Sequence, residues 1–133
     1  MQEINRRYGG REGVVHPDPS ADSRKTSAPV GETDITIIER AGWPVYRNSP
    51  YKIIDRINSV NAMLLNAHGV LRLFISQRCK HLIKALDGLT YKPGSRIPDN
   101  RSGLDHITDA LGYLIMGVCP IITNTTSVQQ VLL

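Results

Sequence analysis

Apolar residues along this chain follow two spacings, one typical of strands and one typical of helices. Short apolar runs of strand length lie at Gly13–His16, Trp43–Tyr46 and Val70–Ile75. Between and after them, apolar residues recur every three or four positions, as on one face of a helix. We therefore predict strands that alternate with helices, which is the order of an α/β protein with a mainly parallel sheet.

Polar caps, prolines and glycines mark where the predicted helices begin and end. Thr33 is expected to cap a short helix that ends before Gly42. Ser49 followed by Pro50 starts the helix with the clearest apolar stripe, which ends before Gly69. The pattern thus predicts two helices between the first and the third strand.

The last two predicted helices also start at serines. Ser76 is expected to cap a helix that ends at Gly88, and Ser102 to open a helix that runs to about Gly117. Asp105 follows Ser102 in the Ser-x-x-acid pattern of a capping box. We therefore assign Ser102 and Asp105 to a helix cap.

Length and polarity divide the 133 residues into one folded unit and two ends. We expect residues 1–12 to be disordered or poorly ordered, because they are polar and show no strand pattern. Residues 13–120 carry the alternating elements and form the predicted domain. Residues 121–133 end in a stretch without a clear period and are of uncertain order.

Composition narrows the class of protein only slightly. Hydrophobic residues make up 41% and charged residues 21%, which is typical of soluble globular proteins, and no apolar stretch is long enough to span a membrane. The polar N-terminus does not resemble a signal peptide, so a cytoplasmic location is expected. The chain contains no phosphate loop, so we expect no bound nucleotide. A net charge of +4 suits a polyanionic partner without proving one.

Two aspartates are the strongest candidates for chemistry. Asp109 is the only charged residue between Thr108 and Pro120, so it either lies at the exposed edge of its helix or is engaged in function. Asp18 lies between two prolines at the predicted carboxyl end of a strand, where ligands gather in open α/β sheets. Pro-Asp-Pro is equally good turn chemistry, so Asp18 also has a purely structural explanation.

Paired carboxylates from separate elements are what two-metal phosphodiester hydrolysis requires, because Mg²⁺ and Mn²⁺ prefer oxygen ligands. Asp18 and Asp109 are therefore predicted to be catalytic and to hold the metal. His106 is one helical turn from Asp109 and is a further candidate ligand, although a histidine near a helix end is more often structural. Basic residues that could hold a DNA backbone, and that are equally ordinary surface charges, are Arg24, Lys25, Arg56 and Arg101.

Three blocks of the sequence together resemble the nuclease domain of the phage terminase large subunit. They are His16–Ala21, Asp55–Asn61 and Asp105–Tyr113, and shorter similarities lie at Arg72-Leu73 and Cys79-Lys80. The similarity covers roughly residues 13–120, and its specificity lies in the order and spacing of the blocks.

The resemblance implies an RNase H-like mixed sheet flanked by helices and an endonuclease that cuts concatemeric phage DNA. It implies two Mg²⁺ or Mn²⁺ ions held by three acidic residues, of which Asp18 matches the second and Asp109 the third. The first acid belongs to an opening β-hairpin that residues 1–12 do not supply, so we expect an N-terminally truncated segment, such as a prophage remnant. The partners it implies are double-stranded phage DNA, the terminase small subunit and the portal, in the cytoplasm of the host cell.

Other functions remain open at this point, and the sequence does not decide whether the chain is an active enzyme. The main alternative is a non-enzymatic small α/β module that binds DNA or a protein, in which Asp18 and Asp109 serve only structure. A different RNase H-like nuclease, such as a Holliday-junction resolvase, would use the same acids.

Overall fold

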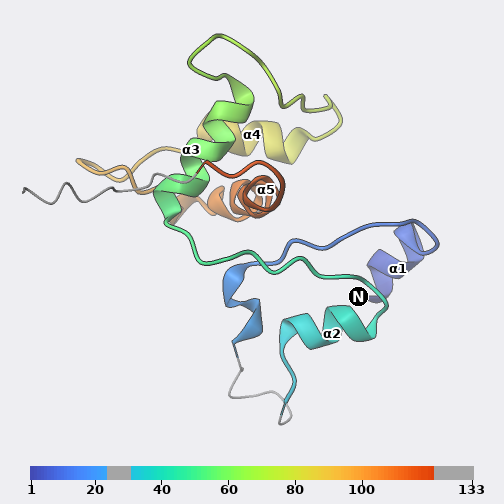
Figure 1. Cartoon of the computed structure of the whole chain (residues 1–133). Helices are drawn as coiled ribbons and strands as arrows, with labels where there is room; N and C mark the ends of the chain where they lie inside the picture. The colour runs from blue at the N-terminus through green and yellow to red at the C-terminus, as the bar shows by residue number, and fades with distance from the viewer. Residues whose placement is uncertain (24–30, 122–133) are drawn as a thin grey trace, which may run out of the picture.

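The computed structural model describes residues 1–23 and 31–121 of the chain. Its α-helices are α1 (Gln2–Tyr8), α2 (Asp34–Arg40), α3 (Ile53–Leu64), α4 (Lys80–Gly88) and α5 (Asp105–Val118). Two short 3-10 helices, η1 (Pro19–Asp22) and η2 (Asn100–Ser102), lie in the connections. Helices α3, α4 and α5 pack together in one part of the molecule, and α1 and α2 lie in the other (Figure 1).

The prediction of an RNase H-like mixed sheet, with or without an opening hairpin, is wrong, because residues 1–23 and 31–121 contain no strand. The first two predicted strands meet only in one parallel bridge between Val15 and Val45. The Val15 amide donates to the Pro44 carbonyl at 2.9 Å, and the Tyr46 amide donates to the Val15 carbonyl at 2.9 Å. Pro17 and Pro44 have no amide hydrogen to donate, so this ladder cannot grow into a sheet.

The third predicted strand is a separate case. Residues 70–75 carry β-favouring side chains, but no neighbouring strand in the described part of the chain pairs with them. The Met63 carbonyl instead accepts hydrogen bonds from the amides of Arg72 at 2.9 Å and Leu73 at 2.8 Å. Phe74 is left 80% exposed. A β-prone run forms a strand only where a partner edge exists, which the sequence pattern cannot guarantee.

The predicted helices exist, with shifted ends. Thr33 caps α2 as expected: its hydroxyl accepts from the Thr36 amide at 3.2 Å, and the Thr36 hydroxyl accepts from the Thr33 amide at 2.8 Å. Helix α3 begins at Ile53 instead of Pro50, and α4 at Lys80 instead of after Ser76. Residues 1–12, for which little order was predicted, contain α1.

The apolar core lies between α3, α4 and α5. Its buried side chains there are Val60, Ala85, Ile115 and Met116. The fully buried Ser59 hydroxyl donates to the Asp55 carbonyl at 2.8 Å and accepts from the Ile121 amide at 2.7 Å, so the chain that follows α5 is tied to α3. No helix within residues 1–23 and 31–121 combines the length and the apolar character that crossing a membrane requires.

Candidate acid site

Asp18 sits where the chain turns into η1. It is the N-cap of that 3-10 helix, and its Oδ1 accepts a hydrogen bond from the Ser20 amide at 2.7 Å. Pro19 fits the first position of the helix because it has no amide that would need a partner. Asp18 therefore has the structural role in a turn that the Pro-Asp-Pro motif allows. This role uses only one of the two carboxylate oxygens of Asp18.

The other oxygen of Asp18 reaches α5. Asp18 Oδ2 accepts a hydrogen bond of 2.6 Å from the Tyr113 hydroxyl, which belongs to the third block of the family resemblance. The Asn48 side chain donates to the Tyr113 carbonyl at 3.0 Å, so a second polar contact holds the same turn of α5. Asp18 is thereby attached to the helix that carries Asp109.

Asp109 is paired with a cation from α3. Arg56 Nη2 lies 2.7 Å from Asp109 Oδ1, and the two side chains are 9% and 30% exposed. A charge as buried as that of Arg56 is tolerable only when it is paired. Arg56 is therefore a buried, paired cation of α3 and not an ordinary surface charge, and its predicted contact with a DNA backbone stays a prediction.

Tyr113 links Asp18 to the ion pair of Arg56 and Asp109. The guanidinium carbon of Arg56 lies 5.0 Å from the centre of the Tyr113 ring, within the range of a cation–π contact. Asp18, Arg56, Asp109 and Tyr113 thus form one continuous set of contacts, which we call the acid cluster. It contains one cation between two carboxylates.

The contacts of the acid cluster shift the proton affinities of its members. Burial alone would raise the pKa of Asp18, but hydrogen bonds from Tyr113 and Ser20 and the charge of Arg56 lower it below its usual value. The pKa of Tyr113 is raised by burial and by the hydrogen bond to Asp18. Both pKa shifts favour the same state, in which an ionised Asp18 accepts a hydrogen bond from the hydroxyl of a neutral Tyr113.

A second tyrosine lies in the same electrostatic field. Burial raises the pKa of Tyr51, and the charges of Asp18 and Asp109 raise it further, while Arg56 lowers it. Its hydroxyl oxygen is buried and has no hydrogen-bond partner among the residues described. Tyr51 therefore adds a polar group beside the acid cluster without being bonded to it.

The acid cluster borders a cavity of about 140 Å³ between α3, α4 and α5. Arg56, Asp109 and Gly112 are among the residues that line it. The lining also includes the apolar side chains of Ile57, Val60, Leu86, Leu89 and Pro98, together with Asn61, Thr90, Tyr91 and Thr108. The Arg56–Asp109 pair therefore has open space on one side.

The donor set does not fit a two-metal centre as it stands. Within residues 1–23 and 31–121, no three His, Cys, Asp or Glu side chains lie close enough together to hold a metal ion. Asp109 is engaged by Arg56, and both oxygens of Asp18 accept hydrogen bonds. His106 is exposed on α5 and belongs to no such group. The sequence reasoning pointed to two acids that share one cluster, but it missed the cation between them.

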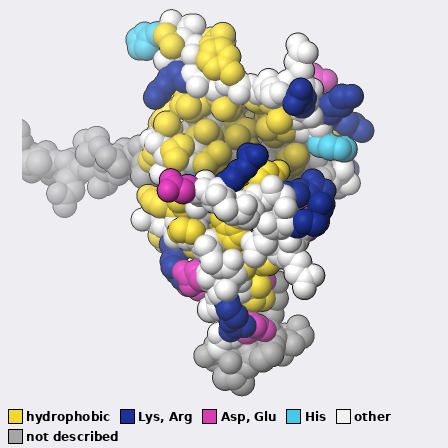
Figure 2. Space-filling model, turned by 90° about the vertical axis from the view of Figure 1, so that its right-hand side faces the viewer, with side chains coloured by type: hydrophobic (Ala, Val, Ile, Leu, Met, Phe, Trp, Pro, Cys, Tyr) yellow, Lys and Arg dark blue, Asp and Glu magenta, His cyan; other side chains and the backbone are white. Residues whose placement is uncertain are grey.

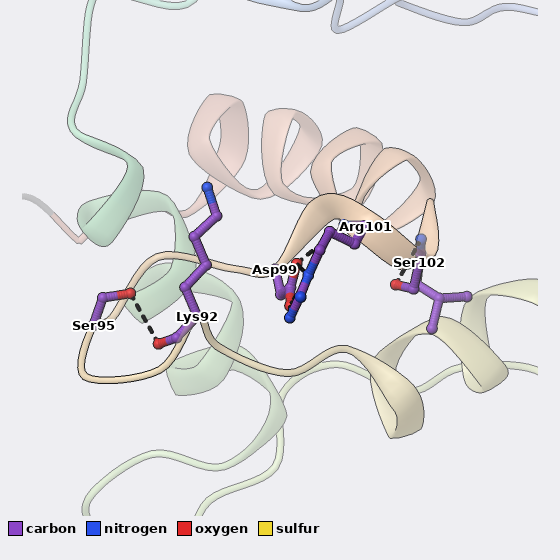
Figure 3. Close-up of polar contacts among 6 residues, drawn as sticks. Lys92, Ser95, Asp99, Arg101 and Ser102 are labelled. Carbon is purple, nitrogen blue, oxygen red and sulfur yellow. Dashed lines mark hydrogen bonds and ion pairs between the residues drawn. The ribbon is translucent and has the colours of Figure 1, made fainter.

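Arg101, another predicted DNA contact, is bound to a residue two positions earlier. Its guanidinium forms a bidentate ion pair with Asp99, and its amide donates to the same carboxylate at 3.1 Å (Figure 3). The ion pair lowers the pKa of Asp99 to about 2. Arg101 remains largely exposed, so the pair shapes the turn that leads into η2. Arg24 and Lys25 lie outside the described residues.

The capping box predicted for Ser102 and Asp105 is wrong. Helix α5 begins at Asp105 with Leu104 as its N-cap, and no side chain caps it. Ser102 ends η2, and Gly103 follows with a φ of 67°, a left-handed conformation that glycine adopts without strain. The Ser102 hydroxyl accepts only a long hydrogen bond of 3.4 Å from the Leu104 amide (Figure 3). The glycine turn places Ser102 two positions before the N-cap, too early for a capping box.

Two functional candidates escaped the sequence reasoning. The sequence marks Tyr113 only as part of the third block, although its position one helical turn after Asp109 is a usable signal. Arg56 was treated as a surface cation, although the adjacent Asp55 and the nearby Ser59 are also buried polar residues of α3. That run of polar residues inside an amphipathic helix was the signal that α3 has a buried polar face.

Comparisons of the chain with protein-family models, with curated proteins and with solved structures find no match. The acid cluster and the resemblance of the three sequence blocks are therefore the basis for assigning a function.

Proposed function

We propose that this chain is of the terminase-type DNA endonuclease class and that Asp18 and Asp109 belong to its acid site. The observation that carries the proposal is that these two aspartates, far apart in the sequence, meet in the acid cluster through Tyr113 and Arg56.

The position of the acid cluster in the sequence supports the proposal. Asp18 lies in the first block that resembles the family, Arg56 in the second, and Asp109 and Tyr113 in the third. The resemblance of the blocks rests on their order and spacing along the chain and is independent of their contacts. Their convergence is expected if the blocks mark a site; the packing of α3 against α5 accounts for the contact of the second and third blocks, and the bond from Tyr113 to Asp18 adds the first.

The remaining properties of the proposed enzyme follow from the resemblance. Its substrate is double-stranded phage DNA, its cofactor is Mg²⁺ or Mn²⁺, and its partners are the terminase small subunit and the portal in the host cytoplasm. Asp18 and Asp109 would contribute to holding the cation. Because the described donor set does not fit a two-metal centre, we expect the chain in this state to be inactive as a nuclease.

A second candidate is a non-enzymatic binding module, and one observation favours it. Each carboxylate already has partners within the protein: Asp109 has Arg56, and Asp18 has Tyr113 and the Ser20 amide. Acids that are satisfied in this way can serve stability alone.

Titration with Mn²⁺, followed by electron paramagnetic resonance of the free ion, separates the two candidates. The proposal predicts weak, saturable binding that Asp18→Asn and Asp109→Asn each abolish. Asp87→Asn, which removes an exposed aspartate on α4, is the matched control and should bind as the unaltered chain does. Absence of saturable binding, or binding that survives both substitutions, would favour the non-enzymatic module.

A further inference from the structure

We propose that the segment after α3, together with α4, forms a surface that binds peripherally to an anionic lipid membrane, with Phe74 inserted among the lipids. We call it the basic apolar surface, and its residues are Arg72, Phe74, Arg78, Lys80, Ile83 and Lys84. None of them belongs to the acid cluster or lines its cavity, so the inference goes beyond the proposed function and does not depend on it.

Positive charge is concentrated in this part of the chain. Residues 65–88 contain four Lys or Arg and one acid, which gives a net charge of +3, while the whole chain carries +4. The four cations are exposed, and none of them forms an ion pair within residues 1–23 and 31–121. Their charge is therefore available to an anionic partner.

The extended segment between α3 and α4 presents Phe74 to the outside. Phe74 is 80% exposed, whereas its neighbours Leu73 and Ile75 are half-buried. Side chains of an extended chain alternate between two sides, so Phe74 lies on the outward side together with the exposed Arg72. An aromatic side chain that is this exposed projects from the surface and does not line a hollow.

The turn before Phe74 is held by its own hydrogen bonds. Asn66 Oδ1 accepts from the Val70 amide at 2.9 Å, and the Asn66 amide donates to the Val70 carbonyl at 3.1 Å. The Met63 carbonyl, near the end of α3, accepts from the Leu73 amide at 2.8 Å. The backbone on both sides of this turn is therefore fixed to α3, and it holds Phe74 in its outward position.

Helix α4 continues the surface. Ile83 and Lys84 follow Lys80 by three and four positions, which places all three on one side of the helix, and all three are exposed. Ala85 is buried where α4 packs on α5. Residues 65–79 and α4 lie at the same end of the helical core, away from α1 and α2 (Figure 1). Figure 2 shows a face with apolar side chains gathered together and Lys and Arg around them.

An anionic lipid surface suits both the charge and the apolar side chains. Exposed apolar side chains with a polar rim mark sites that bind proteins or membranes, and Lys and Arg clusters on an amphipathic helix are typical of sites for anionic headgroups. Duplex DNA would pair with the cations, but its phosphate backbone offers no apolar environment for Ile83. A second copy of the chain would bring like charges together. Lipid chains, in contrast, adapt to a projecting side chain such as Phe74.

Co-sedimentation of the full chain with vesicles tests the proposal. One set of vesicles contains equal amounts of phosphatidylcholine and phosphatidylserine, and the other contains phosphatidylcholine alone. We expect saturable binding to the mixed vesicles that weakens as salt is added, and no binding to the neutral ones. Phe74→Ser should lower the affinity about tenfold, because an inserted aromatic side chain is lost. Tyr8→Ser is the control, because it removes an exposed aromatic side chain of α1.

Further variants test the charges and the insertion separately. Lys80→Gln combined with Lys84→Gln should lower the affinity about thirtyfold, from about fivefold for each basic residue at an anionic surface. Arg11→Gln combined with Lys52→Gln is the control, because it changes the net charge equally at two exposed residues outside the surface. In Phe74→Trp, mixed vesicles should shift the tryptophan emission to shorter wavelength, whereas the emission of Trp43 in the unaltered chain should stay unchanged.

Circular dichroism verifies that each variant keeps its helix content, so that a loss of binding reports the surface. The proposal is overturned by absence of binding to the mixed vesicles, by equal binding to both kinds of vesicle, or by binding that Phe74→Ser leaves unchanged. Binding to a short DNA duplex that the paired lysine substitutions abolish, in a chain that binds no vesicles, would assign these cations to DNA instead.

Discussion

The Tyr113 hydroxyl donates a hydrogen bond of 2.6 Å to Asp18 and so ties the first turn after the N-terminal segment to the last long helix. Asp18 and Tyr113 are 95 positions apart in the chain. The bond is therefore a long-range tertiary contact, and removing it tests how the two parts of the molecule are held together.

Tyr113→Phe should destabilise the protein by about 1 kcal/mol, because it removes one hydrogen bond to a partly exposed charged group. The ring contact with Arg56 is kept, so the effect reports the hydroxyl alone. Urea denaturation followed by circular dichroism measures it. Tyr91→Phe is the control, because the Tyr91 side chain is exposed and should contribute nothing comparable. Equal midpoints for Tyr113→Phe and the unaltered chain would show that the bond has no net effect on stability.

The stability of the fold should fall as the pH is lowered from about 4 towards 2, the range in which unfolded aspartates take up protons. Folding lowers the pKa of Asp18, and it lowers that of Asp99 to about 2. A group whose pKa is lower in the folded state stabilises the protein above its unfolded pKa, and this contribution is lost as the pH falls through its folded pKa. Thermal melts across this range measure the loss. Asp99→Asn should make the melting temperature depend less steeply on pH. An unchanged pH dependence would contradict the role of the Asp99–Arg101 pair.

Asp109→Ala should destabilise the protein by about 2 kcal/mol, because it leaves the buried charge of Arg56 without its partner. The value is below that of a fully buried pair, since Asp109 is partly exposed. From the apolar sequence around Asp109 alone, removal of its charge would be expected to be neutral or stabilising, and the ion pair reverses that expectation. Chemical denaturation measures the change, with Asp87→Ala as the exposed control. A stability equal to that of the control would mean that Arg56 finds another partner.

The purified chain should not linearise supercoiled plasmid in the presence of Mg²⁺ or Mn²⁺. Both acids of the cluster are engaged by protein groups, and no three potential ligands lie together within residues 1–23 and 31–121. Agarose gels of plasmid incubated with the protein give the readout, and a restriction enzyme shows that the plasmid can be cut. Linearisation that disappears in Asp109→Asn would establish a complete catalytic site and contradict this prediction.

The helices were predictable from sequence because their apolar periodicity is a local property. Helix α3 repeats its apolar positions over twelve residues. Thr33 is a residue type that favours an N-cap, and its hydroxyl caps α2. Strands were not predictable in the same way, because a run such as Val70–Ile75 becomes a strand only if another segment pairs with it. Pro17 and Pro44, close to Val15 and Val45, are the sequence signal that limits pairing between these two segments.

The sequence predicted the two acids of the candidate site, but it did not predict that a cation neutralises Asp109. Asp109 stood out because it is the only charge in an apolar run, and Asp18 because of its flanking prolines. The pairing of Asp109 with Arg56 depends on how α3 crosses α5, which no local pattern encodes. The role of Gly112 could not be predicted from the sequence, because its lack of a side chain matters only where Arg56 lies against it.

The bridge between Val15 and Val45 also bears on how the molecule opens. Two backbone hydrogen bonds join these segments, and they lie between the helical core and the part that holds α1 and α2 (Figure 1). Figure 2 shows apolar side chains gathered over one face of the molecule, with Lys and Arg around them. Segments held by few hydrogen bonds unfold locally at lower free energy than a packed core. The amides of Val15 and Tyr46 should therefore exchange with deuterium well before those in the middle of α3 and α5, so that the chain opens as two cooperative units.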